Sequence, residues 1–167
     1  MSKHTVFVEA PPFAKFSDAE MRRLLDDERL EVLDWRGKRV NTPGFVEALA
    51  TADIAVTGNS LTITDELLEK LPNLKLIAKL GTGLDMIDIP AVLRRGILLC
   101  NTPGAIIDAY SQEPLTASPL FSLDNVILSP HAGAFTTDAL NAMSRMSVDQ
   151  LFQYVDGAMP DNLVTAE

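Results

Sequence analysis

The sequence predicts an α/β domain with a parallel, five-stranded sheet that is doubly wound, so that helices cover both faces. Two observations carry this prediction. In residues 1–104 short β-rich runs alternate with amphipathic segments that carry helix caps, the pattern of a parallel sheet wrapped by helices. The chain has 167 residues, of which 47% are hydrophobic and 22% charged, enough for the core of one ordinary domain.

The predicted strands are short apolar runs bounded by turn residues. They cover residues 5–8, 30–35, 54–57, 74–78 and 97–100. Polar residues interrupt the run 30–35, which favours a place near an edge of the sheet.

Helix-starting and helix-ending signals lie between these strands. Residues 17–20 have the pattern of a capping box, and Met21, Leu24 and Leu25 are expected to share the face that follows. Thr42-Pro43 has the pattern of an N-cap with a first-turn proline, before a helix that carries Val46, Leu49 and Ala50.

Three more helices follow. One is predicted from Thr64 to Leu71, where Pro72 stops it, and a short one over 89–95 ends at Gly96. The last and longest begins at Thr136 or Thr137 and ends near Val155. Its expected apolar face consists of Leu140, Met143, Leu151, Phe152 and Val155.

Five β-α units of this length predict a flavodoxin-like sheet of order 2-1-3-4-5. Residues 125–129 are a candidate extra strand, and whether they join the sheet stays open at this point.

Composition and charge exclude several classes of partner. The net charge of −9 argues against nucleic acid and anionic membranes. No apolar run approaches the ~20 residues of a membrane span, and no signal peptide precedes the first strand, so we expect a cytoplasmic protein. The single cysteine, Cys100, fits a reducing compartment and lies in an apolar run, which predicts a buried core thiol.

The turn after the fourth strand is the first candidate site. It contains Lys79, Gly81, Thr82 and Gly83, and successive amides in a glycine turn at a strand's carboxyl end can form an anion site. The alternative is that the glycines only permit a tight turn. Lys79 is a candidate for neutralising an acidic substrate, although a solvated surface lysine is the commoner role for such a residue.

Several motifs together are similar to those of the D-isomer-specific 2-hydroxyacid dehydrogenases, a family that includes phosphoglycerate dehydrogenase. They are the glycine turn, Ile87-Asp88, Arg95-Gly96, Asn101-Thr-Pro-Gly104, Glu113-Pro114 and Ser129-Pro-His131-Ala-Gly133. The resemblance implies that the glycine turn binds the substrate carboxylate. It also implies that His131 is the acid that protonates the carbonyl oxygen as hydride arrives, and that Glu113 holds its imidazole. The other histidine, His4, is expected to be exposed.

The resemblance stops at the cofactor. The sequence has no G-x-G-x-x-G between a strand and a helix, so no cofactor is expected in this chain, although NAD serves the family. In the family a whole dinucleotide-binding domain, which also carries the catalytic arginine, lies between the two pieces that meet here at Ala105 and Ile106. Arg94 and Arg95 belong to the short helix and are not its replacement.

We therefore expect one substrate-binding domain over 1–167. It would comprise β/α units in 1–104, a remnant of the cofactor domain in 105–135, and a C-terminal helix and tail in 136–167. The leading hypothesis is a separated dehydrogenase domain, inactive alone, that binds a small 2-hydroxy or 2-oxo acid. The alternatives are a self-associating module, forming a homodimer or a domain-exchanged oligomer, an engineered minimal domain without a ligand, and an enzyme completed by a second chain. The parent's hydroxy acid, and whether the deletion is natural or engineered, stay open.

Overall fold

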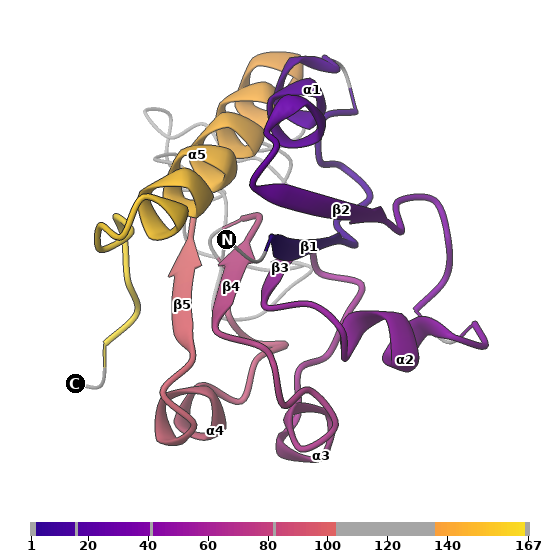
Figure 1. Cartoon of the computed structure of the whole chain (residues 1–167), viewed down its shortest axis with the longest axis vertical. Coiled ribbons are helices and arrows are strands. Elements are labelled where there is room, and N and C mark those ends of the chain that lie inside the picture. The colour runs from indigo at the N-terminus through magenta and orange to yellow at the C-terminus, as the bar shows by residue number, and fades with distance from the viewer. Residues whose placement is uncertain (1–2, 16, 41, 82, 103–135, 166–167) are drawn as a thin grey trace, which may run out of the picture.

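A computed structural model describes residues 3–15, 17–40, 42–81, 83–102 and 136–165 of the chain (Figure 1). The elements follow in the order β1 (His4–Val8), α1 (Ala19–Asp26), β2 (Leu30–Asp34), α2 (Phe45–Leu49), β3 (Ile54–Thr57), α3 (Asp65–Leu68), β4 (Leu76–Lys79), α4 (Ile89–Arg94), β5 (Leu98–Asn101) and α5 (Thr137–Val155). The five strands form one parallel sheet of order β2-β1-β3-β4-β5, which confirms the predicted fold class and topology. The candidate strand 125–129 lies outside the described residues.

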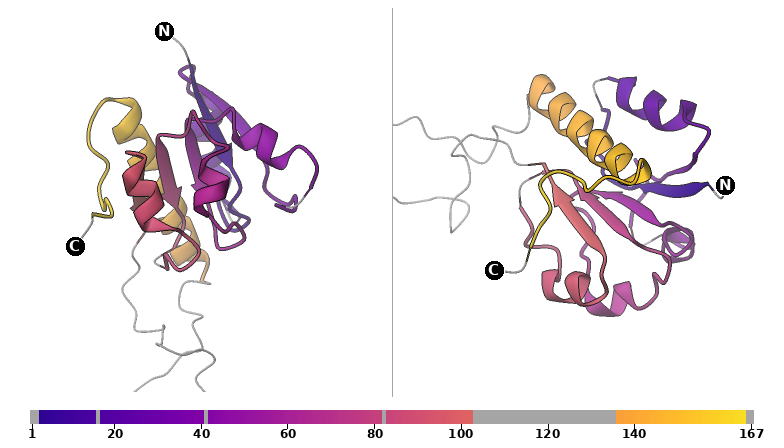
Figure 2. Two further views of the ribbon diagram at one scale, coloured as in Figure 1. Left: turned by 90° about the horizontal axis from the view of Figure 1, so that it is seen from below. Right: turned by 60° about the vertical axis from the view of Figure 1, so that its left-hand side comes forward.

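The sheet is buried on both faces. Side chains of alternate strand residues point to opposite sides, so Val6 and Val8 pack on one side and Phe7 on the other. Helices α1 and α5 cover the first side, and α2, α3 and α4 cover the second (Figure 2). This two-sided burial explains why the central strands are continuous apolar runs rather than alternating ones.

The two edges of the sheet differ. Among the described strands β2 pairs only with β1, as its interrupted apolar pattern predicted. Beside β5 the C-terminal tail runs antiparallel, with Leu163 bridged to Cys100 and the Val164 amide donating to the Leu99 carbonyl at 2.7 Å. The tail therefore covers part of an edge that would otherwise offer unpaired backbone groups.

Two helix starts differ from the prediction. α1 begins at Ala19 after Asp18, and the Ser17 hydroxyl accepts from the Ala19 amide at 3.3 Å instead of closing a capping box. Met21 and Leu24 are buried as expected, but Leu25 is 60% exposed. One residue rotates a helix by about 100°, which carries Leu25 off the buried face.

The second helix begins later than predicted, at Phe45 rather than at Thr42-Pro43. The Thr42 hydroxyl donates to the Arg39 carbonyl at 2.6 Å and so belongs to the preceding turn. Phe45 and Leu49 are the buried residues of this short helix, with Phe45 edge-on to the Phe7 ring.

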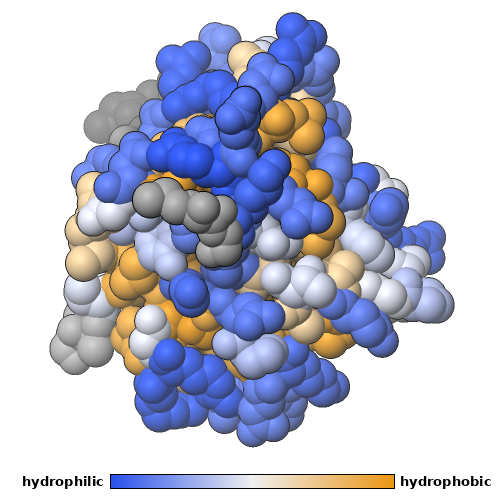
Figure 3. Space-filling model, viewed as in Figure 1, coloured by the Kyte–Doolittle hydropathy of each residue, from blue (hydrophilic) through white to orange (hydrophobic). Residues whose placement is uncertain are grey.

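A side chain caps the start of each remaining described helix. Thr64 accepts from the Leu67 amide at 3.2 Å, and Thr136 accepts from the Ala139 amide at 3.1 Å. Asp88 caps α4 by accepting from the Ala91 amide at 3.0 Å. None of the described helices is both long and apolar enough to cross a bilayer, and polar side chains cover most of the face shown in Figure 3.

A buried serine ties α5 to the loop that follows β1. The Ser144 hydroxyl donates to the Leu140 carbonyl at 2.8 Å and accepts from the Ala14 amide at 3.0 Å. One turn later Ser147 is equally buried, but its hydroxyl has no partner among the described residues. Replacing each serine by alanine in turn therefore shows how much the hydrogen bonds of Ser144 contribute to stability.

Replacing Ser144 by alanine should lower the free energy of unfolding by about 1–3 kcal/mol, because the buried Ala14 amide loses its acceptor. Ser147→Ala should cost less than about 0.5 kcal/mol, since no hydrogen bond to a described residue is lost. Urea unfolding followed by Trp35 fluorescence measures both. Equal losses in the two variants would contradict the assignment of the Ser144 contact.

Candidate functional site

The site lies where the order of the strands reverses. β2 lies on one side of β1, whereas β3, β4 and β5 follow on the other, so β1 and β3 flank the switch point. In open parallel sheets, ligands bind in the crevice outside the carboxyl ends of the strands at such a point. Here that edge carries a group of polar side chains, which are Glu9, Asn59, Ser60, Lys79 and Thr102.

The residue after β1 is a buried carboxylate. Glu9 is 1% exposed, and its Oε2 accepts from the Gly58 amide at 3.2 Å. Its Oε1 accepts from the Ser60 hydroxyl. Burial of a carboxylate is costly unless donors surround it, and both donors come from the turn after β3. A side chain at Gly58 would place its Cβ 3.3 Å from the Ala10 Cα, so this turn lies close against the chain after β1.

Lys79, the last residue of β4, is buried rather than solvated. It is 1% exposed, and its Nζ donates to the Asn59 Oδ1 at 2.6 Å and to the Leu80 carbonyl at 2.8 Å. Burial lowers the pKa of the Lys79 ammonium to about 8, and the carboxylates of Glu9 and Asp85 partly oppose that shift. The alternative of a solvated surface lysine is therefore wrong.

The glycine turn lies over this ammonium. Gly81 has φ +110°, in the region that favours glycine, and a Cβ there would lie 3.4 Å from the Lys79 Nζ. The Gly81 amide donates to the Thr102 hydroxyl at 2.7 Å, and the Thr102 amide returns a 3.3 Å bond to the Gly81 carbonyl. Gly81 therefore shapes the turn, and its own amide is already used within the protein.

The charges around the turn are mixed. Lys79 brings one positive charge, whereas Glu9 and Asp85 each bring a negative one. A Cβ at Gly83 would lie 3.4 Å from an Asp85 carboxylate oxygen, so one of these negative charges is next to the turn itself. An anion here would meet one favourable charge and two unfavourable ones, which limits how tightly these residues alone can hold it.

Lys79, Gly81 and Gly83 lie at the end of β4 and in the turn that follows it. Thr82, Glu113 and His131 lie outside the described residues. Sequence reasoning missed the supporting set, Glu9, Asn59, Ser60 and Thr102. The available signal was their position in the chain. Each of these four residues lies within three residues after the end of an apolar strand, and the carboxyl ends of parallel strands meet at one edge of the sheet.

Other candidate chemistry is limited in the described part of the chain. No cluster of three or more metal-ligating side chains occurs there. Cys100 is buried, and burial raises the pKa of its thiol to about 12, which confirms the predicted core role. His4 is partly buried instead of exposed, because its Nδ1 pairs with an Asp53 carboxylate oxygen and its ring lies edge-on to Tyr154.

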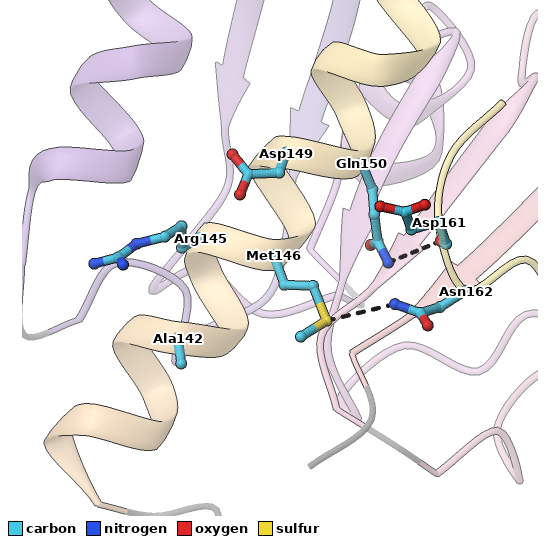
Figure 4. A pocket seen from close by; sticks show the side chains of 7 residues that line it. All are labelled: Ala142, Arg145, Met146, Asp149, Gln150, Asp161 and Asn162. Atoms are coloured by element: carbon cyan, nitrogen blue, oxygen red, sulfur yellow. Dashed lines mark hydrogen bonds between the residues drawn. The ribbon is translucent and has the colours of Figure 1, made fainter. Parts of the chain in front are cut away.

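A separate groove lies between α5 and the C-terminal tail (Figure 4). It is lined by Ala142, Arg145, Met146, Asp149, Gln150, Asp161 and Asn162. The Gln150 amide crosses its floor and donates to the carbonyls of Asn101 and Asp161, each at 3.0 Å. These bonds hold the tail against the end of β5.

Comparison with known proteins shows the family to which this chain belongs. Residues 12–165 match the sequence profile of the D-isomer specific 2-hydroxyacid dehydrogenase catalytic domain. Glyoxylate reductase from Pyrococcus furiosus is 30% identical over 130 residues, which are 72% of this chain and 37% of the relative. Hydroxypyruvate reductase from Thermotoga maritima is 32% identical over 106 residues, 63% of this chain and 32% of the relative.

Solved structures show a similar fold. The NAD+-bound 3-phosphoglycerate dehydrogenase of Entamoeba histolytica matches 61% of this chain and 33% of its own, with 26% identity and a TM-score of 0.52. A 2-hydroxyacid dehydrogenase from Ketogulonicigenium vulgare shares the fold over the full chain, with 13% identity and a TM-score of 0.66.

The chain thus spans about a third of the length of the curated relatives that it matches. The profile match, by contrast, covers nearly all of this chain and both sides of the sheet. The protein belongs to the D-isomer specific 2-hydroxyacid dehydrogenase family, through its catalytic domain.

Proposed function

We propose that this chain is the substrate-binding part of a D-2-hydroxyacid dehydrogenase and receives the carboxylate of a small 2-oxo or 2-hydroxy acid at the turn of Gly81 and Gly83. The observation that carries the proposal is the buried Lys79 ammonium beneath that turn. The turn lies at the carboxyl edge of the sheet, next to the switch point. Relatives named glyoxylate reductase and hydroxypyruvate reductase support a small acid as the ligand.

The described residues do not fit a dinucleotide. In a dinucleotide-binding turn the glycines open directly into a helix, whose N-terminus holds the pyrophosphate. Here the turn is followed by Asp85, and α4 begins only at Ile89. A carboxylate next to Gly83 repels a pyrophosphate. We therefore assign no cofactor to this chain and derive no hydride-transfer step from it.

The proposal extends to the layout of the chain. Residues 105–135 are the remnant that joins the two parts of the substrate domain, and they carry Glu113 and His131, the partner and acid that the family resemblance implies. Because the cofactor half and its arginine are missing from this sequence, the chain alone should not turn over. The negative charges of Glu9 and Asp85 partly cancel the positive charge of Lys79. The chain should therefore bind an acid weakly, with a Kd of about 1 mM (about −4 kcal/mol).

Calorimetric titration with glyoxylate and with hydroxypyruvate at pH 7 tests the site. Gly81→Ala should weaken binding about tenfold, or ~1.4 kcal/mol, since a Cβ strains the turn and approaches the Lys79 Nζ. Gly96→Ala is the matched control, because Gly96 also has a positive φ (+68°) but open space around its Cβ. It should bind like the parent protein. Flat heats at millimolar acid, or equal losses in both variants, would exclude this site.

The pH dependence of binding tests the role of the ammonium. The pKa of Lys79 is lowered to about 8, so its positive charge is present below pH 8 and lost above it. Affinity for glyoxylate should therefore fall between pH 7 and pH 9. Lys79→Met should bind weakly at all these pH values, whereas the exposed Lys75→Met should keep the parent's profile. A parent affinity that stays constant through pH 9 would rule out the ammonium as the anion's partner.

A further inference from the structure

Two groups of hydrogen bonds, joined by the backbone of residues 58–60, connect three strand ends next to the glycine turn. Glu9, after β1, accepts from the Gly58 amide and from the Ser60 hydroxyl. These two donors flank Asn59 in the chain, so the carboxylate holds the turn on both sides of that residue. The Asn59 Oδ1 in turn accepts from the Lys79 Nζ at 2.6 Å.

The Lys79 ammonium, at the end of these hydrogen bonds, lies next to the proposed site. A Cβ at Gly81 would lie 3.4 Å from the Lys79 Nζ, so the ammonium lies directly against the turn. The position of the ammonium therefore depends on Asn59, and the position of Asn59 depends on Glu9. All of these side chains lie at the carboxyl edge between β1, β3 and β4.

Hydrogen bonding alone does not require a carboxylate at position 9. A glutamine there has the same shape, with a carbonyl oxygen to accept from the Gly58 amide and an amide that can donate to the Ser60 oxygen. The feature that only glutamate supplies is a negative charge, and it is buried within a low-dielectric crevice. Charges interact more strongly there than at the surface.

That charge acts on Lys79. In the described part of the chain, Glu9 from the end of β1 and Asp85 from the turn after β4 are the charged groups that favour its protonated form. From the turn after β3 comes the neutral side chain of Asn59, and from the end of β5 the neutral side chain of Thr102, which binds the Gly81 amide. Asp85 lies next to the turn, where it also opposes an anion, whereas Glu9 lies behind the turn.

We propose that Glu9 is a positioning residue of the carboxylate site, which fixes Asn59 and supplies the charge that keeps Lys79 protonated beneath the glycine turn. This inference rests on the proposed function, since it gives the ammonium its role toward a bound acid. Glu9 does not touch the acid. It sets the pH range over which Lys79 carries its positive charge.

The experiment follows the titration of the Lys79 amine by NMR in the free protein, with lysine labelled at the ε-carbon. Glu9→Gln should lower the titration midpoint by about 0.5 unit or more, because a facing negative charge is removed. Asn59→Asp should raise it, because a negative charge is added at the ammonium's hydrogen-bond acceptor. Because the two variants should shift the midpoint in opposite directions, the test does not rest on one variant alone.

Asp53→Asn is the matched control. Asp53 lies just before β3, at the amino end of the strands, whereas Lys79 lies at the carboxyl end. The variant removes its carboxylate, whose Oδ1 accepts from the Thr5 amide at 2.7 Å. This variant should lose stability and leave the Lys79 midpoint unchanged. If Glu9 had only a structural role, Glu9→Gln would likewise lose stability and leave the Lys79 midpoint unchanged. An unshifted midpoint in Glu9→Gln therefore overturns the inference.

A second measurement, the pH dependence of glyoxylate binding, separates this inference from the proposed function. If the parent protein binds glyoxylate, the pH at which half the affinity is lost should move down in Glu9→Gln together with the amine midpoint. An affinity profile that stays in place while the midpoint moves would overturn the positioning role. If the parent protein binds no acid, the proposed function fails, and a lowered midpoint in the free variant still supports the control of Lys79 by Glu9.

Discussion

The site depends on one buried ammonium. Lys79 ends the inner strand β4 and bonds to Asn59 in the turn after β3, and the glycine turn lies against it. An unpaired cation in this position would be strongly disfavoured, so the neighbouring polar groups are a requirement of burial. The carboxylate of Glu9, the Asn59 amide and the Leu80 carbonyl together meet that requirement. The parallel sheet makes it possible, because it brings the ends of β1, β3 and β4 to one edge.

The same arrangement limits what these residues can do with an anion. One ammonium facing two carboxylates can orient an anion but holds it weakly. Nothing in the described residues adds a nicotinamide site, and the sequence has no dinucleotide fingerprint. The described residues therefore supply the family's fold and one candidate site for an anion.

Local sequence patterns predicted most of the fold. β3 was predicted over the residues where it occurs, because an apolar run is bounded by Asp53 and Gly58. The spaced apolar residues of α5 predicted a helix from Thr136 or Thr137 to near Val155, and the helix covers Thr137–Val155. Thr42-Pro43 misled because the Thr42 hydroxyl binds a preceding carbonyl instead of a helix amide. The site was harder. Lys79 looks like a surface lysine in its own segment, and its burial is decided by Glu9 and Asn59, which the sheet brings to it from far along the chain.

The central claim is that the Lys79 ammonium is the group that meets the substrate's carboxylate. The most direct measurement is the titration midpoint of its amine, by NMR, without and with saturating glyoxylate. Since a bound anion favours the protonated amine, the account predicts a midpoint near pH 8 in the free protein and a higher one in the complex. If glyoxylate binds and the midpoint does not move, the carboxylate lies elsewhere and the account is wrong.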